Sequence, residues 1–294
     1  MLAVGLVAAG IGGGAVAGDA GAGAAPSAHA STVTLSYGSD PLQTVTVYPA
    51  STPGSPLIVF VHGGGFQSTA SLANQIGPLA STLSHAGFAV FNVNYRTDAP
   101  KVPAFPNEVD DIETGTRLAI ADASKYDGNP TNVTLVGGSA GGSLVALAGE
   151  ALGPTVVKNV VGLSGVYDFP MELSYWTQVG TKDAYTHLVH ETVALGCPHR
   201  TAASCSSAVA KQWSADQQVT VHNCPSQWLL VNGANETNGT PVAQPDAMTK
   251  SLNTAGCHVT ETIVSGTDAT KASWDLWDDV SAAVEAMAQG GGSG

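Results

Sequence analysis

The chain has 294 residues, of which 44% are hydrophobic, and its 10 Lys and Arg against 23 Asp and Glu give a net charge of -13 at pH 7. This length and apolar content suit one large α/β domain. The acidic balance argues against nucleic acid and anionic membrane surfaces as partners, since both need basic patches. The scattered histidines and the absence of a C-x₂-C pair predict neither a metal site nor a cofactor.

Residues 1–30 resemble an export leader. An apolar Gly/Ala-rich run covers 2–17, and Ala28-His29-Ala30 has the small-residue pattern of a cleavage site. The usual positive region after Met1 is missing, which leaves a truncated start or a different role open. A membrane-spanning helix is disfavoured because the apolar run is short and glycines interrupt it. We therefore expect a secreted protein without a stable membrane span.

After the leader, apolar strands alternate with helical segments. Strands are predicted at residues 32–35, 43–48, 57–61, 89–94, 133–136, 160–164, 228–232 and 259–264. Helices are predicted at residues 74–86, 107–126, 141–152, 245–255 and 276–287. This rhythm indicates an α/β fold with a mostly parallel central sheet flanked by helices. The first two strands alternate in polarity and favour an antiparallel edge.

One long segment, 167–223, lacks a strand of this rhythm and is aromatic and polar. We interpret it as a small helical cap insertion within a single domain spanning 31–289. Its aromatic side chains either line an acyl or aryl pocket or only pack the cap onto the body. The final residues, 290–294, are Gly and Ser and predict a flexible tail.

The strand at 57–61 runs into His62-Gly63-Gly64-Gly65-Phe66. A glycine run after a strand leaves backbone N–H groups uncovered and aimed at one point, as an oxyanion hole requires. We predict that the N–H groups of Gly63 and Gly64 are donors, together with that of Ala140. His62 belongs to this loop, and its expected role is to brace the loop.

The strand at 133–136 leads into Gly137-Gly138-Ser139-Ala140-Gly141, which fits G-x-S-x-G. Such a serine stands on a sharp strand-to-helix turn with its hydroxyl exposed above a parallel sheet. Small neighbours are needed because the backbone folds tightly there. Ser139 is therefore the predicted nucleophile.

These features together resemble the α/β-hydrolase carboxylesterases and lipases of the secreted bacterial type, in particular the hormone-sensitive-lipase-like and feruloyl/acetyl-esterase-like groups. The resemblance spans about residues 57–288. Its motifs are His62–Phe66, Asn94–Arg96, Pro106–Asp111, Gly128–Pro130 and Gly137–Gly142. The resemblance implies the α/β-hydrolase fold and an acyl-enzyme mechanism, with catalytic residues in the chain order Ser, acid, His.

In the family, the acid stands three residues after the glycine that ends the strand at 228–232. Gly233 ends that strand here, so the matching residue is Glu236. A glutamate suits the task of holding an imidazole and stabilising its charged form. Asp246 is the alternative, although its position on the next helix is more typical of a charge at a helix N-terminus.

The same resemblance places the histidine in a Gly-x-x-His loop after the strand at 259–264. The matching residue is Ala269, and no histidine follows His258. Without a base, a serine hydroxyl is a poor nucleophile. Three explanations remain open. The histidine was removed by engineering; it was lost naturally, which gives an ester-binding pseudo-enzyme; or another base replaces it. The candidate bases are Lys271 and the cap histidines His187, His190 and His199.

Four cysteines in an exported chain suggest two disulfides, for which three pairings exist. We favour Cys197–Cys205, which closes a small loop in the cap segment, and Cys224–Cys257. The second pair precedes two strands that should be neighbours, so its cysteines should lie close together. Four free thiols are the alternative.

The sequence predicts a secreted serine carboxylic-ester hydrolase that acts on short-chain or aryl esters, small or polymeric, and that is impaired at position 269. A non-catalytic ester-binding protein is the competing class. A peptidase or amidase on the same fold is the competing enzyme.

Overall fold

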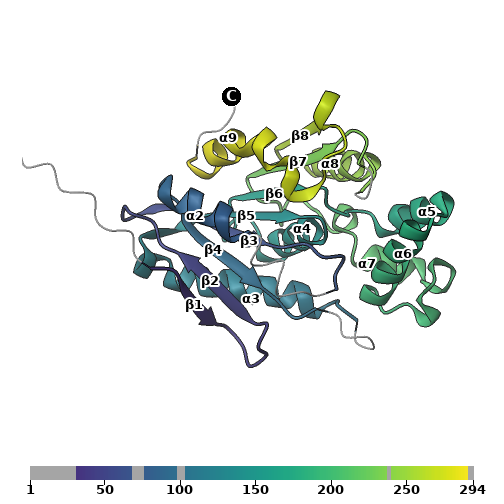
Figure 1. The fold of residues 1–294 in the computed structure, drawn as a ribbon, viewed down its shortest axis with the longest axis horizontal. Helices are drawn as coiled ribbons and strands as arrows, with labels where there is room; N and C mark the ends of the chain where they lie inside the picture. Colours follow the sequence, from purple (N-terminus) through teal and green to yellow (C-terminus); the bar gives the residue numbers. More distant parts are fainter. Residues whose placement is uncertain (1–30, 68–75, 98–102, 237–239, 291–294) are drawn as a thin grey trace, which may run out of the picture.

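The computed structural model describes residues 31–67, 76–97, 103–236 and 240–290. Within them, eight strands form one sheet in the order β1-β2-β4-β3-β5-β6-β7-β8 (Figure 1). The strands are β1 (Val33–Ser36), β2 (Thr44–Tyr48), β3 (Ser55–Val61), β4 (Ala89–Asn94), β5 (Gly128–Gly138), β6 (Asn159–Leu163), β7 (Gln227–Gly233) and β8 (Val259–Val264). β1 and β2 pair antiparallel and the strands from β4 to β8 pair parallel, so the predicted antiparallel edge is confirmed.

Helices cover both faces of this sheet. They are α2 (Gly77–His85), α3 (Asn107–Asp122), α4 (Ala140–Leu152), α8 (Ala243–Ala255) and α9 (Trp277–Ala288). Three more helices, α5 (Phe169–Val179), α6 (Lys182–Ala194) and α7 (Ser207–Gln212), lie to one side of the sheet (Figure 1). The buried side chains of α3, α4 and α8 belong to one apolar core, and those of α2 and α9 belong to a second. Strands buried on both faces explain the nearly continuous apolar runs in the sequence.

Most element boundaries agree with the prediction to within two residues, and two differ by more. β5 begins at Gly128, five residues early, because residues before its apolar run also pair with β3 at Ser55. The helix predicted at 107–126 divides into α3 and a 3₁₀ turn, Ala123–Tyr126. The start of the helix predicted at 74–86 lies outside the described residues.

An ion pair between a half-buried arginine and a buried aspartate fixes α3 against the end of β4. Arg96 donates to Asp111 through Nε (2.9 Å) and Nη2 (2.7 Å), and its backbone N–H donates to the same carboxylate (2.9 Å). The Asp111 side chain is 2% exposed and also accepts a hydrogen bond from Gln43. Such two-pronged, charge-assisted contacts are strong and directional. They give a structural reason for two of the motifs noted in the sequence.

The segment 167–223 contains α5, α6 and α7 with short 3₁₀ turns between them. Its aromatic side chains mostly pack inward: Phe169 contacts Phe66 and Phe105 with ring centroids 5.7 and 5.8 Å apart, and Trp213 stacks on Phe105 at 4.9 Å. Tyr185 is the exception, with 66% of its surface exposed. The packing interpretation therefore holds for Phe169 and Trp213.

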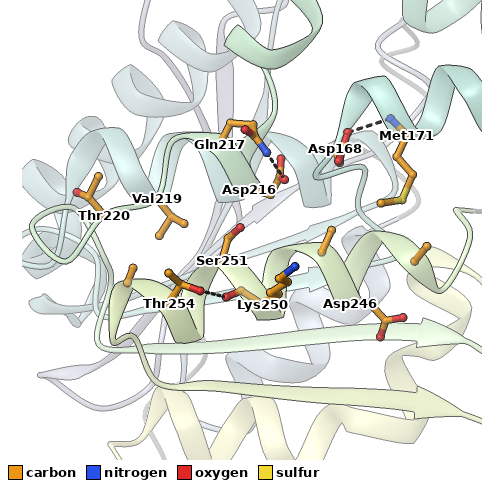
Figure 2. A pocket seen from close by; sticks show the side chains of 13 residues that line it. Asp168, Met171, Asp216, Gln217, Val219, Thr220, Asp246, Lys250, Ser251 and Thr254 are labelled. Atoms are coloured by element: carbon orange, nitrogen blue, oxygen red, sulfur yellow. Dashed lines mark hydrogen bonds between the residues drawn. The ribbon is translucent and has the colours of Figure 1, made fainter.

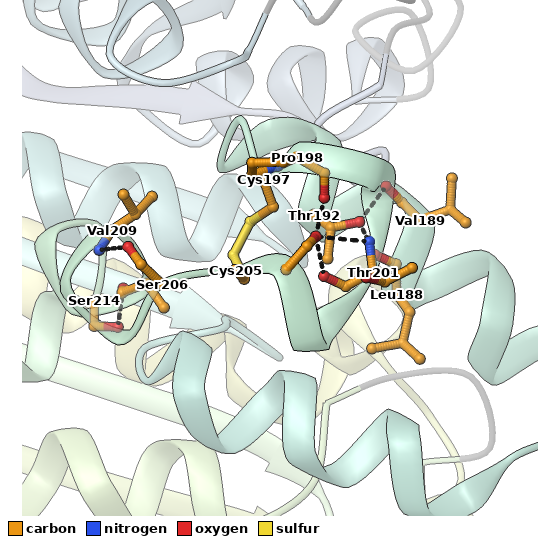
Figure 3. The surroundings of a disulfide bond; sticks show 12 residues. Leu188, Val189, Thr192, Cys197, Pro198, Thr201, Cys205, Ser206, Val209 and Ser214 are labelled. Atoms are coloured by element: carbon orange, nitrogen blue, oxygen red, sulfur yellow. Dashed lines mark hydrogen bonds between the residues drawn. A yellow bond between two sulfur atoms is a disulfide. The ribbon is translucent and has the colours of Figure 1, made fainter.

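The four cysteines form two disulfides, in the pairing favoured from the sequence. Cys197 bonds to Cys205 within the segment 167–223, with Cα atoms 4.7 Å apart (Figure 3). Cys224 bonds to Cys257 with Cα atoms 6.1 Å apart. This second bond joins residues that lie just before β7 and β8, which pair from Trp228 and Val259 onward.

In the described part of the chain, none of the helices combines the length and the apolar character needed to cross a membrane.

Candidate active site

Ser139 occupies the turn between β5 and α4 and has φ 56°, in the left-handed region that non-glycine residues rarely adopt. The turn is tight because two of its glycines pack directly against other backbone atoms, which leaves no room for a side chain. A Cβ on Gly137 would overlap the backbone of Gly141, and a Cβ on Gly141 would lie 2.5 Å from the carbonyl oxygen of His62. The strain is thus held by close approach of the flanking chain, as a nucleophile turn requires.

The glycine run after β3 lies against this serine. A Cβ on Gly63 would be 2.5 Å from the Gly138 carbonyl oxygen and 3.0 Å from Cβ of Ser139. Gly64 has φ 123°, which favours glycine. The N–H of Ala140 lies at the start of α4, where helix geometry provides no intrahelical acceptor. The three expected donors therefore belong to two loops that meet at Ser139.

His62 is buried behind the glycine run. Its Nδ1 lies 2.7 Å from the Gly63 carbonyl oxygen, its Nε2 lies 3.1 Å from Oδ1 of Asn94, and its ring stacks on Tyr95 at 4.3 Å. The Tyr95 hydroxyl donates to the His62 carbonyl oxygen at 2.7 Å. Burial lowers the pKa of His62 and favours the neutral imidazole. These contacts support the loop-bracing role expected of His62.

Glu236 is fixed in the loop that follows β7. Its Oε1 accepts hydrogen bonds from Ser164 Oγ (2.7 Å) and from the backbone N–H of Gly233 (2.8 Å). Its Oε2 is buried and makes no well-formed hydrogen bond with the described residues. Burial raises the pKa of Glu236 to about 7, although the hydrogen bonds from Ser164, Gly233 and the Thr240 backbone oppose the rise. In the part of the chain that the structure describes, this second oxygen has no imidazole beside it, which is the partner that a triad acid normally has.

The loop that carries Ala269 lies beside the Glu236 loop. The Asn235 N–H donates to the Ala269 carbonyl oxygen at 2.7 Å, and a Cβ on Gly233 would be 2.6 Å from that oxygen and 3.1 Å from Cγ of Glu236. Ala269 itself is 6% exposed. The structure therefore places the loop of residue 269 directly against the loop of Glu236, as the family order of residues requires.

Asp246, the alternative acid, lies elsewhere. It stands on α8 and lines a groove of about 740 Å³ that includes Asp168 and Lys250 but neither Glu236 nor Ala269 (Figure 2). Its carboxyl shares a hydrogen bond with Glu261 of β8. This position favours Glu236 over Asp246 as the candidate acid.

Lys271 fits poorly as a substitute base. Its Nζ lies 3.0 Å from Oδ2 of Asp279 and 3.3 Å from Oδ1 of Asp268. The hydrogen bond to Asp279 raises the pKa of Lys271, with Asp268 acting in the same direction. A protonated amine cannot accept the proton of a serine.

One histidine of the segment 167–223 comes close to the site, on the side of the glycine run. His190 of α6 packs on the glycine run, with its Nδ1 2.9 Å from the position of a Cβ on Gly65. His187, one turn earlier on α6, stacks on Trp176 at 4.2 Å. His199 lies in the exposed turn Pro198–Arg200. A base has to approach the serine from the side opposite the oxyanion hole, so His190 is misplaced for that role.

Two serines near the site carried no signal in the sequence. Ser164 follows β6 with φ 53°, and its Oγ accepts the Ser273 N–H at 2.7 Å while donating to Glu236. Ser273 has φ 55°, and its Oγ would lie 2.5 Å from a Cβ on Gly138. Ser164 thus links the acid loop to the loop beside the nucleophile. Only unusual backbone angles mark these residues, and a sequence does not display them.

We predict that Glu236 makes the free energy of unfolding depend on pH. Its pKa in the folded state, about 7, exceeds the ordinary 4.5, so the folded protein holds this proton more tightly. The resulting stability is fully present below pH 4.5 and is lost as pH rises through 7, with a total of about 3 kcal/mol. The free energy of unfolding is measured in urea at pH 4.5 and at pH 8. Between these pH values it should fall by this amount more in the parent than in Glu236→Gln.

The control for that comparison is Asp275→Asn, on an exposed residue. Its difference from the parent should be the same at both pH values. An unchanged difference for Glu236→Gln would show that the carboxyl is ionised at little cost in the folded protein.

The sheet order, the strained serine and the glycine run beside it define an α/β-hydrolase of the esterase type. The BD-FAE family model matches residues 46–209, more than half of the chain, and the chain belongs to this family.

Among curated proteins, the chain is similar to the esterase LipC of Mycobacterium tuberculosis, with 33% identity over 148 residues, which cover 45% of this chain and 36% of LipC. It is also similar to the kynurenine formamidase of Meyerozyma guilliermondii, with 32% identity over 150 residues, 46% of this chain and 53% of that enzyme. The chain thus matches between about a third and a half of the length of these two relatives.

Solved structures share the fold at low identity. A truncated carbohydrate esterase from gut microbiota matches with a TM-score of 0.68 at 18% identity, over 89% of this chain and 97% of that one. The carboxylesterase Cest-2923 of Lactobacillus plantarum matches with a TM-score of 0.62 at 16% identity, over 90% and 98% of the two chains. These matches support the fold, and the predicted α/β-hydrolase architecture is confirmed.

Proposed function

We propose that this chain is the scaffold of a serine carboxylic-ester hydrolase whose general base is missing. The observation that carries the proposal is the meeting of Ser139, strained at φ 56°, with the glycine run at Gly63. Backbone N–H groups aimed at one point beside a serine hydroxyl serve a reaction in which a carbonyl oxygen becomes negative. Ester hydrolysis through an acyl-enzyme is such a reaction.

In the proposed reaction, Ser139 Oγ attacks the ester carbonyl carbon and loses its proton to a base. The carbonyl oxygen takes the negative charge and is held by the N–H groups of Gly63, Gly64 and Ala140. When the tetrahedral intermediate collapses, the bond to the alcohol oxygen breaks and the alcohol leaves with the proton. Water then takes the place of the alcohol: it gives a proton to the base and attacks the acyl carbon, the bond to Ser139 Oγ breaks, and the acid leaves as Ser139 regains its proton.

The base is the part that this chain does not supply at the expected place. Glu236 would orient an imidazole at position 269 and stabilise its positive form, but Ala269 has no ring. Since Lys271 is engaged by two carboxylates and His190 lies on the oxyanion side, neither replaces it well. A protein that binds esters without turning them over is therefore a second candidate, favoured by this specific loss.

The proposed substrates are esters of moderate size with short acyl or aryl groups. These ester groups belong to small molecules or to polymers. The similarity to a kynurenine formamidase keeps amide substrates as the alternative within enzymes. We further propose that the chain is exported, which its two disulfides and the leader-like composition of residues 1–30 support. The segment 167–223 would act as a cap over the site.

Peptide mapping tests the proposed nucleophile. The Ala269→His variant is mixed with p-nitrophenyl acetate, stopped in acid after a few turnovers and digested. We expect one acetyl group on the peptide that contains Ser139 and none in the matched Ala269→His, Ser139→Ala variant. Acetyl groups on lysines alone, equal in the two variants, would refute an acyl-enzyme at Ser139.

A further inference from the structure

The backbone of Gly63–Phe66, which we call the oxyanion loop, has a shape that few residues adopt. Gly64, Gly65 and Phe66 have φ angles of 123°, 61° and 61°, all in the positive region. Glycine tolerates these angles, but a phenylalanine there is an outlier that persists only where its surroundings hold it. The glycines have no side chains with which to fix the loop. Its shape must therefore be held by contacts with residues of other segments.

Phe66 is anchored by two phenylalanine rings from elsewhere in the chain. Its side chain is 2% exposed, and its ring centroid lies 5.4 Å from that of Phe105 and 5.7 Å from that of Phe169. The rings of Phe105 and Phe169 meet each other at 5.8 Å. Phe169 begins α5, and its N–H donates to Ser214 Oγ at 2.9 Å. The strained residue is thus held in a closed triangle of rings, one of which belongs to the segment 167–223.

A histidine of the same segment packs on the neighbouring glycine. His190 of α6 has its Nδ1 2.9 Å and its Cγ 3.6 Å from the position of a Cβ on Gly65, so the ring lies against the loop where a side chain would stand. Ala194, the last residue of α6, accepts a hydrogen bond from the Phe105 N–H at 3.3 Å. The helix α6 therefore holds both Gly65 and one of the rings around Phe66.

We propose that the segment 167–223 positions the oxyanion loop. His190 acts through Gly65, and Phe169 acts in the same way through Phe66. The inference rests on the proposed ester hydrolysis, which it deepens. Hydrogen-bond donors stabilise a developing negative charge only if they are already in place, and small displacements cost much of the rate. Both are positioning residues, since their role is to keep the N–H groups of the loop aimed at one point.

The first kinetic test uses Ala269→His as the active background and p-nitrophenyl acetate as the substrate. Adding His190→Ala should lower kcat roughly tenfold and leave KM nearly unchanged, because the displaced donors act mainly in the transition state. Adding His190→Phe should retain kcat, because a flat ring still lies on Gly65. The matched control is His187→Ala, one turn earlier on α6, where the ring stacks on Trp176. It should leave kcat unchanged.

Phe169→Leu tests the ring contact, again in the Ala269→His background. It keeps an apolar side chain but removes the ring that faces Phe66, so kcat should again fall roughly tenfold. Phe91→Leu makes the same change at a fully buried residue of β4, whose ring meets that of Tyr126 at 5.8 Å. This control should lower the free energy of unfolding to a similar extent and leave kcat unchanged.

A measurement on the unmodified chain needs no turnover. The Gln67 N–H donates to the Gly64 carbonyl oxygen at 3.0 Å and closes the oxyanion loop. A loop that loses an outside contact opens more often, which exposes this amide to solvent. Its hydrogen exchange, followed by NMR, should be roughly tenfold faster in His190→Ala and unchanged in His187→Ala.

The outcomes separate the two proposals. If Ala269→His hydrolyses the ester while His190→Ala and Phe169→Leu change neither kcat nor the exchange of Gln67, the positioning proposal is overturned and the esterase proposal stands. Equal losses of kcat in the control variants would also overturn it, because they would reflect a general loosening of the protein. If no ester is hydrolysed but the exchange of Gln67 still depends on His190, the positioning of the loop stands and the proposed hydrolysis fails.

Discussion

Replacing Ala269 with histidine should raise the hydrolysis of p-nitrophenyl acetate on the order of 10³-fold or more. The new imidazole would stand beside Glu236, whose buried Oε2 makes no well-formed hydrogen bond with the described residues. That oxygen would accept the Nδ1–H of the ring and leave Nε2 to take the serine proton. Loss of one triad member typically leaves only a small part of the rate, so its return recovers several orders of magnitude.

Two further variants test whether the restored activity depends on Ser139 and on Glu236. Ser139→Ala added to Ala269→His should return the rate to the uncatalysed level. Glu236→Gln added to Ala269→His should lower kcat while leaving KM nearly unchanged, because it acts on the ring and not on the substrate. If the unmodified chain already matches Ala269→His in a Ser139-dependent way, another residue is the base and the assignment of position 269 is wrong.

The second large effect concerns stability. Gly141→Ala should lower the free energy of unfolding by roughly 4 kcal/mol, at the upper end for single substitutions. The new Cβ would lie 2.5 Å from the carbonyl oxygen of His62 and closer still to that of Val61. Both obstacles are backbone at the end of β3, so neither side-chain rotation nor a small shift removes them. Urea denaturation measures the loss.

Gly87→Ala is the matched control because it separates backbone strain from overlap. Gly87 has φ 97°, and nothing lies within 4 Å of a Cβ built there. It should cost about 1 kcal/mol through strain alone. Equal effects of the two substitutions would mean that the serine turn relaxes freely, which contradicts a turn held by close backbone contact.

The central part of the fold follows from local patterns. Apolar runs of four to six residues and the helical segments between them predicted the sheet, and the alternating polarity of the first two strands predicted its antiparallel edge. Element ends were less accurate, as at Gly128, because pairing with a distant strand extended β5 beyond its apolar run. Patterns that repeat within a few residues are readable along the chain; pairing partners are not.

What the sequence determined by itself is the local chemistry: a serine between small residues after a buried strand, a glycine run after another, and an alanine where the family has a histidine. What only the tertiary structure decided is which distant groups meet there. Ser164 binds a carboxyl 72 positions away, and Ser273 binds Ser164 across 109 positions. Packing between separate elements also produces three further arrangements. Lys271 pairs with Asp279, His190 approaches the glycine run, and Trp274 forms a wall of a cavity beside α2. Such contacts arise from the shape of the assembled chain, because no local propensity encodes them.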